Sequence, residues 1–388
     1  MARFLLSRAL RRGPMPYPDD VPILHGSGPD PDRILLIGGG LVRGIGIRSN
    51  ELGIAGNLAR KLAASTGRGA DVEAIGIEML SARRAIEVLR TQNLARFDAV
   101  VLMLGNSEVL SGRPMRLWRR DIRTVLASIA QIAPDGPPML IAASPPFSAA
   151  IDVAPILRRR VARGIARLNA ETRRAVAESV VATFIDFDDA GPAPTVGSRA
   201  ADAYESWATA MVVPVVNAIA SATPLRDRTV PIDESARQRA LDDLGIVGSE
   251  QQAVFDRIVE MARDMLGAPA ASLTIIDRDR QWMVSARGIA DDDIPRSESI
   301  CDMTIQTPGV SLVEDAASTP QFRDASWVAG DEHIRAYAGY PLEAPGGQRV
   351  GCLCVMDRSP RHFTPDDVAT LRDLALRAQR ELWLVAAN

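Results

Sequence analysis

Lysine, histidine and cysteine are all scarce in this chain of 388 residues. Lys61 is the only lysine, so arginine supplies nearly all of the positive charge, and the net charge is −3. A chain with no basic excess is not expected to bind nucleic acid. The three cysteines, Cys301, Cys352 and Cys354, fit neither a disulfide framework nor a zinc site with histidine.

Long apolar runs are also absent. No stretch approaches the roughly 18–20 residues of a membrane-spanning helix, so no transmembrane segment is predicted. The apolar stretch at the N-terminus is too short for a secretory signal, and we therefore expect a cytoplasmic protein. The arginines of residues 1–12 are interpreted as a frayed basic tail. Contact with an anionic membrane surface is the alternative interpretation.

Apolar runs and helical patterns alternate from residue 32 to residue 221, after an N-terminal tail expected over residues 1–31. Continuous Val, Ile and Leu runs separated by amphipathic helices predict a parallel sheet covered on both faces. The fold class expected for this half is a doubly wound, flavodoxin-like α/β domain. The runs expected to form strands are Ile34–Gly38, Val72–Ile77, Ala99–Leu104, Met139–Ala143 and Thr183–Phe187.

The order of elements changes after a linker expected at residues 222–232, which contains Pro224 and Pro231. Two helical patterns come first in residues 233–386, short strands follow, and a long helix ends the region. Helices at both ends of an antiparallel sheet make an α+β domain. The chain is therefore predicted to have two domains of different classes.

Two motifs in the second half, Ile334–Leu342 (IRAYAGYPL) and Gly351–Asp357 (GCLCVMD), carry a family resemblance. They resemble I-R-F-Y-A-G-x-P-L and G-T-L-C-V-x-D of bacterial GAF sensor domains, and the similarity extends over nearly all of residues 233–384. The resemblance implies helices on one face of the sheet and a small-molecule pocket on the other. It includes no cyclic-nucleotide signature, and it leaves the ligand and any cofactor unknown. The expected ligand-binding residues are Trp282, Ser299, Cys301, Asp315, Phe322, Tyr337 and Cys354.

Each of these residues also has a structural interpretation. Cys352 and Cys354 stand two apart in a strand, so they face the same side and are expected in the core. Trp282 and Tyr337 suit a core position in which the indole N–H or the phenol O–H has a hydrogen-bond partner. The last helix is predicted to form a homodimer contact or, alternatively, to pack on its own sheet.

The first half resembles the SGNH/GDSL hydrolases over roughly residues 33–220, but most of the catalytic set is missing. The resemblance implies an ester hydrolase in which a serine attacks, a histidine is its base, and a glycine and an asparagine line the oxyanion hole. The family's serine falls at Gly40 and its glycine at Gly53. The family's asparagine falls at Ser107. Its aspartate and histidine fall at Thr195 and Ser198.

None of the three histidines lies in residues 33–220, and a serine nucleophile needs a base within hydrogen-bond reach. The leading hypothesis is therefore a sensory or regulatory pseudoenzyme, in which a GAF domain is coupled to a degenerate SGNH-like domain. The alternative is a GAF-regulated hydrolase with a nonstandard set, for which Ser107 beside Glu108 is a nucleophile candidate. A protein with a purely structural role is a third reading. The output partner is unknown.

Overall fold

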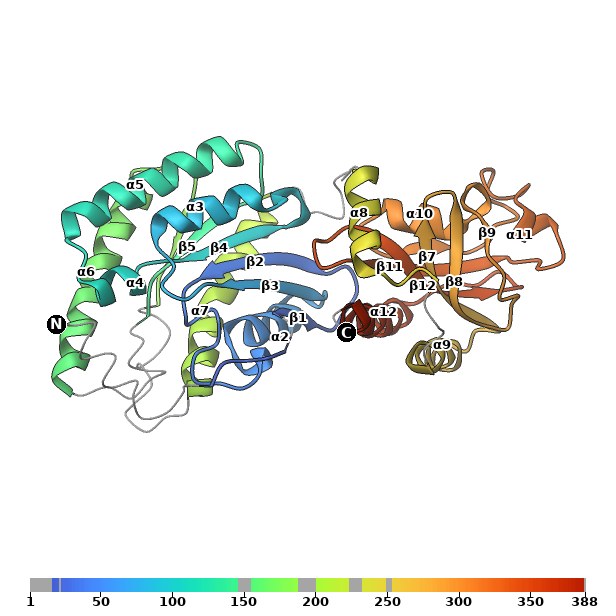
Figure 1. The fold of residues 1–388 in the computed structure, drawn as a ribbon, viewed down its shortest axis with the longest axis horizontal. Coiled ribbons are helices and arrows are strands. Elements are labelled where there is room, and N and C mark those ends of the chain that lie inside the picture. Colours follow the sequence, from blue (N-terminus) through green and yellow to red (C-terminus); the bar gives the residue numbers. More distant parts are fainter. Residues whose placement is uncertain are drawn as a thin grey trace. The chain divides into compact units, whose positions relative to one another are not determined.

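The computed structural model describes residues 16–20, 22–145, 155–187, 200–222, 232–248 and 253–386 (Figure 1). The chain divides into two compact units, one made mainly of residues 31–225 and the other mainly of residues 226–388. Each unit has its own six-stranded sheet. Among the described residues, no helix combines the length and the apolar character needed to cross a membrane.

The first unit is built on a sheet whose strand order is β1-β3-β2-β4-β5-β6. All neighbouring pairs are parallel except β1 and β3. The five parallel strands therefore follow the flavodoxin-like order 2-1-3-4-5, and the predicted α/β class is confirmed. The strands are β1 (Ile23–Gly26), β2 (Asp32–Gly38), β3 (Ala70–Gly76), β4 (Ala99–Met103), β5 (Met139–Ala142) and β6 (Thr183–Ile185).

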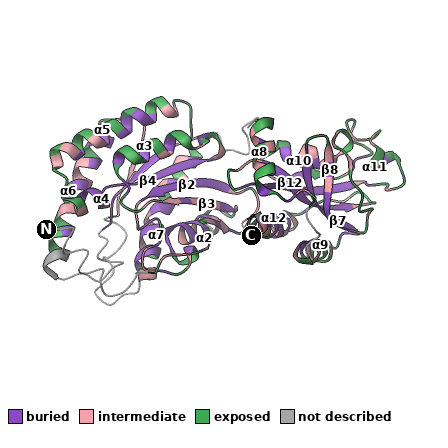
Figure 2. Ribbon diagram, in the orientation of Figure 1, coloured by how far each residue is buried: buried purple, intermediate pink, exposed green. Residues whose placement is uncertain are grey.

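Helices cover both faces of this sheet because alternate residues of its strands point to opposite sides. Ile34 and Leu36 of β2 pack under α2 and α7, whereas Leu35 and Ile37 pack under α3, α5 and α6. The central strands β2, β4 and β5 are buried along their whole length (Figure 2), as a doubly covered sheet requires. The helices are α2 (Ile54–Thr66), α3 (Ala82–Thr91), α4 (Asn106–Ser111), α5 (Met115–Ile132), α6 (Pro155–Ala177) and α7 (Ala200–Ala220).

The segment expected to be an N-terminal tail contributes a strand. Ile23–Gly26 forms β1, which pairs antiparallel with β3 at the edge of the sheet. Leu24 is 3% exposed and belongs to the core under α2, so the burial of one side chain and a ladder of backbone hydrogen bonds hold this strand.

The second unit is an α+β domain, as predicted. Its sheet has the order β10-β11-β12-β7-β8-β9, and every neighbouring pair is antiparallel. The strands are β7 (Ala270–Asp277), β8 (Arg280–Arg287), β9 (Ile294–Pro295), β10 (Ser311–Val313), β11 (Ala336–Glu343) and β12 (Arg349–Asp357). The helices are α8 (Glu234–Leu244), α9 (Ala253–Met265), α10 (Ile300–Gln306), α11 (Ser326–Ala329) and α12 (Pro365–Ala386).

The two faces of this second sheet differ. Helices α8, α9 and α12 cover one face, where Leu353 and Val355 of β12 join the main core. The short helices α10 and α11 cover the other face, where Cys352 and Cys354 lie in a smaller cluster. Leu371, Leu374 and Leu382 of α12 are buried in the main core, whereas Leu384 is about half exposed. Most of the apolar residues of the last helix therefore pack on its own sheet.

Candidate functional site

A cavity of about 300 Å³ lies on the α10 and α11 face of the second sheet. This volume is at the lower end of the range for small-molecule sites. Its walls are mainly apolar and come from β8, the segment that follows β8, α10, α11 and β12. The apolar side chains of the wall are Met283, Ile289, Ala290, Ile294, Ile300, Trp327, Ile334 and Met356.

The polar groups inside the cavity centre on Gln281. Its side chain is 5% exposed, and its Oε1 accepts a hydrogen bond from Ser299 Oγ at 2.6 Å. The backbone N–H of Asp302 donates to the same Ser299 Oγ, which caps α10. Among the described residues, Gln281 Nε2 has no hydrogen-bond partner, although Gln281 lines the cavity. An amide nitrogen without a partner leaves two donors available to a ligand.

Three buried cysteines lie at one side of this cavity. The sulfur atoms of Cys301, Cys352 and Cys354 are within 4.8 Å of one another, and Cys301 reaches the cavity wall. Ser272 Oγ lies 3.1 Å from Cys354 Sγ, and Tyr337 Oη lies 3.7 Å from Cys301 Sγ. Hydrogen bonds from the other two thiols lower the pKa of Cys301.

In contrast, burial raises the pKa of Cys352 and of Tyr337. Of the described residues, these three cysteines are the set whose ligand atoms are close enough to hold a metal ion. Ser272, Thr274 and Tyr337 lie within hydrogen-bond distance of these sulfur atoms, so the cluster can also be a polar part of the core.

The residues predicted to bind ligand divide into three groups. Cys301 lines the cavity, and Ser299 contacts it through Gln281. Tyr337 and Cys354 are fully buried behind Cys301. Phe322 packs behind the cavity wall, with its ring 5.6 Å from that of Trp327.

The remaining two predicted residues do not line this cavity. The Asp315 carboxylate accepts a hydrogen bond from the backbone N–H of Ala317 in the turn that follows β10. Trp282 packs against the main core on the opposite face of the sheet. The reason is strand alternation, because Gln281 and Met283 on either side of Trp282 are the residues of β8 that face the cavity. The alternation was readable in the sequence, but which side faced the cavity was not.

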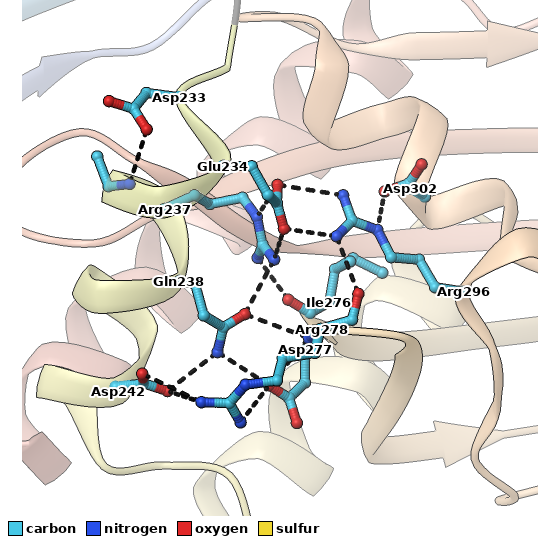
Figure 3. Close-up of polar contacts among 11 residues, drawn as sticks. Asp233, Glu234, Arg237, Gln238, Asp242, Ile276, Asp277, Arg278, Arg296 and Asp302 are labelled. Atoms are coloured by element: carbon cyan, nitrogen blue, oxygen red, sulfur yellow. Dashed lines mark hydrogen bonds and ion pairs between the residues drawn. The ribbon is translucent and has the colours of Figure 1, made fainter.

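A network of charged residues connects the cavity wall to helix α8 (Figure 3). Arg237 is completely buried and donates to Glu234 and to the backbone oxygen of Ile276. Arg296 also binds Glu234, at 2.6 Å, and binds Asp302 of α10 at 2.7 Å. Arg296 therefore bridges α8 and α10, the helix that carries Cys301.

The network has a consequence for acid stability. Hydrogen bonds from Arg237 and Arg296 lower the pKa of Glu234 to about 2. A carboxylate whose pKa is lowered by folding stabilises the protein fully above its unfolded pKa, and this stabilisation is lost as the pH falls towards the folded pKa. Half of the Glu234 side chain is exposed, so water screens part of the effect.

We expect Glu234→Gln to lower the free energy of unfolding of the second unit more at pH 6 than at pH 3. Urea denaturation of wild type and variant at both pH values measures the difference. Asp243→Asn, at an exposed position of α8, is the control and should show no such change. An equal difference at the two pH values would show that the ion pairs do not hold Glu234 ionised.

The first unit has glycine at the position where a nucleophile would be expected. Gly40 follows β2, and a Cβ atom at Gly40 would meet only Tyr17 Oη, at 4.0 Å. Gly53 stands directly before α2. Ser107, in the first turn of α4, is 8% exposed, and its Oγ would lie 3.9 Å from a Cβ atom at Gly39. Ser107 therefore lies near the end of β2, while Thr195 and Ser198 are outside the described residues.

Glu108 and His25 do not form an acid–base pair with Ser107. Glu108 is 4% exposed, burial raises its pKa, and its Oε1 accepts from the backbone N–H of Ala82. His25 Nδ1 lies 2.7 Å from Asp71 of β3. Asp71 is near the start of β3, whereas Gly76 at its end pairs with Gly38. His25 is therefore about 17 Å along the strand from the end where Gly38 and Gly40 lie.

The comparisons with known proteins separate the two units. Residues 250–382, roughly a third of the chain, match the family model of the GAF domain, so the second unit contains a GAF domain. The chain is 39% identical over 146 residues to the cyclic di-GMP phosphodiesterase PA2567 of Pseudomonas aeruginosa. That stretch is 37% of this chain and 25% of the relative, so the chain spans about a quarter of the relative's length.

Solved structures with similarity to each unit are also known. A putative arylesterase from Agrobacterium tumefaciens is 20% identical, with a TM-score of 0.38 over 48% of this chain and 99% of its own. A GAF domain from an Acinetobacter phosphoenolpyruvate-protein phosphotransferase is 19% identical, with a TM-score of 0.30 over 40% of this chain and 92% of its own. The fold classes of the two units rest on their sheet topologies.

Proposed function

We propose that this is a cytoplasmic regulatory protein in which the GAF domain binds a small molecule and controls a non-catalytic, SGNH-like domain. The cavity beside α10 carries this proposal. It combines apolar walls with the buried Gln281, whose Nε2 donors have no partner among the described residues. A largely apolar cavity with a few oriented polar groups is the usual form of a small-molecule site.

The charged network supports a route from this cavity to the linker. Glu298, Ile300 and Cys301 line the cavity, and Arg296 lies two residues before Glu298. Arg296 is ion-paired with Glu234, at the start of the helix that follows the linker. A ligand that favours one position of the Glu298–Cys301 segment would change the Arg296–Glu234 ion pair. A ligand can act on a distant domain in this way if it binds one of the two arrangements more tightly than the other.

The proposal that the SGNH-like domain is non-catalytic rests on Gly40 and on His25. A glycine has no nucleophile, and His25 is held by Asp71 at the amino end of β3. Ser107 is nearly buried, and among the described residues it has no hydrogen bond to a base. A serine without a base keeps its hydroxyl proton and is a poor nucleophile.

Hydrolysis of p-nitrophenyl butyrate by the full chain tests this part. We expect wild type and Gly40→Ser to release p-nitrophenol at the rate of a buffer blank. The serine fits sterically, because a Cβ at Gly40 meets only Tyr17 Oη, but it has no base. Turnover by wild type that Ser107→Ala abolishes would instead make the protein a GAF-regulated hydrolase.

A further inference from the structure

The charges around the GAF cavity are all of one sign. Four carboxylates line it, namely Asp292, Glu298, Asp331 and Glu332. No arginine, lysine or histidine is among the described residues that line it, although arginine is abundant in this chain. Asp292, Glu298 and Asp331 are exposed, so they lie where the cavity meets solvent.

Two of the four carboxylates have partners, and two are left for a ligand. Glu332 lies 3.6 Å from Arg358, and Glu298 accepts a hydrogen bond from Ser326. Asp292 and Asp331 have no ion-pair partner among the described residues. The Arg358 charge offsets one carboxylate, so a negative balance remains at the opening.

The interior of the cavity sets further conditions on the ligand. Its walls carry Trp327, two methionines and several isoleucines, which suit an apolar or aromatic body. Gln281 offers N–H groups that donate hydrogen bonds in the interior, whereas the carboxylates at the opening accept hydrogen bonds and carry negative charge. An anionic ligand such as a nucleotide phosphate would meet like charges at the opening, with no cation to hold it.

We propose that the GAF cavity binds an organic cation, with an amine at the acidic opening and an apolar or aromatic body inside. This inference rests on the proposed function of the cavity and adds the ligand class. The body lies against Trp327 and Met283, where burial of apolar surface supplies most of the affinity. The carboxylates, above all Asp331, select the charge of the ligand.

Probes with the same indole ring and different charges test the proposal. Isothermal titration of the full chain uses tryptamine, indole-3-acetate and 3-methylindole, which share one ring system and carry a positive, a negative and no charge. We expect tryptamine to bind at least ten times more tightly than indole-3-acetate, and this preference to shrink as salt is raised.

Substitutions of the cavity carboxylates test whether these groups cause the preference for tryptamine. We expect Asp331→Asn, alone and combined with Asp292→Asn, to weaken tryptamine binding several-fold while leaving 3-methylindole binding unchanged. The matched control is Asp243→Asn, an exposed carboxylate on α8 outside the cavity, which should change neither. Both sets of substitutions are at exposed positions, so folding is expected to be retained, and far-UV circular dichroism checks this.

The outcomes separate this inference from the proposed function. Binding of 3-methylindole or indole-3-acetate as tight as that of tryptamine would overturn the cation preference but keep the cavity as a small-molecule site. Tryptamine binding that Asp331→Asn and Asp243→Asn weaken equally would also overturn it. Absence of binding by all three probes at millimolar concentration would overturn both proposals.

Discussion

Replacing Arg237 with leucine is expected to lower the free energy of unfolding of the second unit by about 3 kcal/mol. The guanidinium is completely buried, and it donates at 2.5 Å to the backbone oxygen of Ile276. It also binds Glu234 at 2.7 Å and Gln238 at 3.2 Å. Leucine removes every one of these donors and leaves the Ile276 carbonyl without this partner.

The carbonyl accounts for most of this effect. Glu234 is half exposed and keeps its ion pair with Arg296. Water and Arg296 therefore replace part of the interaction that Glu234 loses when Arg237 is removed. A buried carbonyl that loses a charged donor has no such replacement. The measurement is urea denaturation, followed at a wavelength that resolves the transition of the second unit.

Arg239→Leu is the matched control for this substitution. Arg239 is two positions further along α8 and exposed, so the same chemical change there should shift the free energy of unfolding by less than about 0.5 kcal/mol. Equal effects at the two positions would mean that the buried network does not stabilise the domain.

Gly351→Ala is expected to destabilise the second unit by about 3 kcal/mol or more. A Cβ atom at Gly351 would lie 2.1 Å from the backbone oxygen of Thr274 and 2.8 Å from the side chain of Ile275. Gly351 belongs to β12, and it pairs with Ile275 of β7. Both strands are in the middle of the sheet, so the clash can be relieved only by moving backbone that two neighbours hold.

The control for this prediction is Gly309→Ala. A Cβ atom at Gly309 would meet nothing within 4 Å, so alanine there should be neutral or slightly stabilising. The thermal unfolding midpoint of each variant, measured by circular dichroism, distinguishes the two sites. A Gly351→Ala protein as stable as wild type would show that β7 and β12 can separate locally at little cost.

The spacing of apolar residues along the chain, which differs between strands and helices, predicted both fold classes. The five Val, Ile and Leu runs form the five parallel strands. A continuous apolar run is typical of a strand that helices cover on both faces of the sheet. The motif Gly351–Asp357 lies within the strand β12. The strand β1 and the helix α4 were not predicted, and β1 is held by its pairing with β3, a contact between segments far apart in the sequence.

The candidate site was only partly predictable. Cys301 was among the residues expected to bind ligand, and it does line the cavity. Gln281 was missed, although it is adjacent to Trp282, which was named. The family resemblance drew attention to aromatic and sulfur-containing side chains. It could not show on which face of the sheet a side chain lies, because that depends on what packs on each side of the strand.

The amino-acid sequence by itself determined that this chain has an α/β unit and an α+β unit, and that its first unit lacks a histidine in residues 33–220. These properties depend on residue type and on local period, both of which are written along the chain. The tertiary structure alone decided that four carboxylates share one cavity, that Gln281 points into it, and that His25 is bound to Asp71 away from Gly40. Those facts depend on contacts between segments far apart in sequence, which form only when the sheets and helices pack.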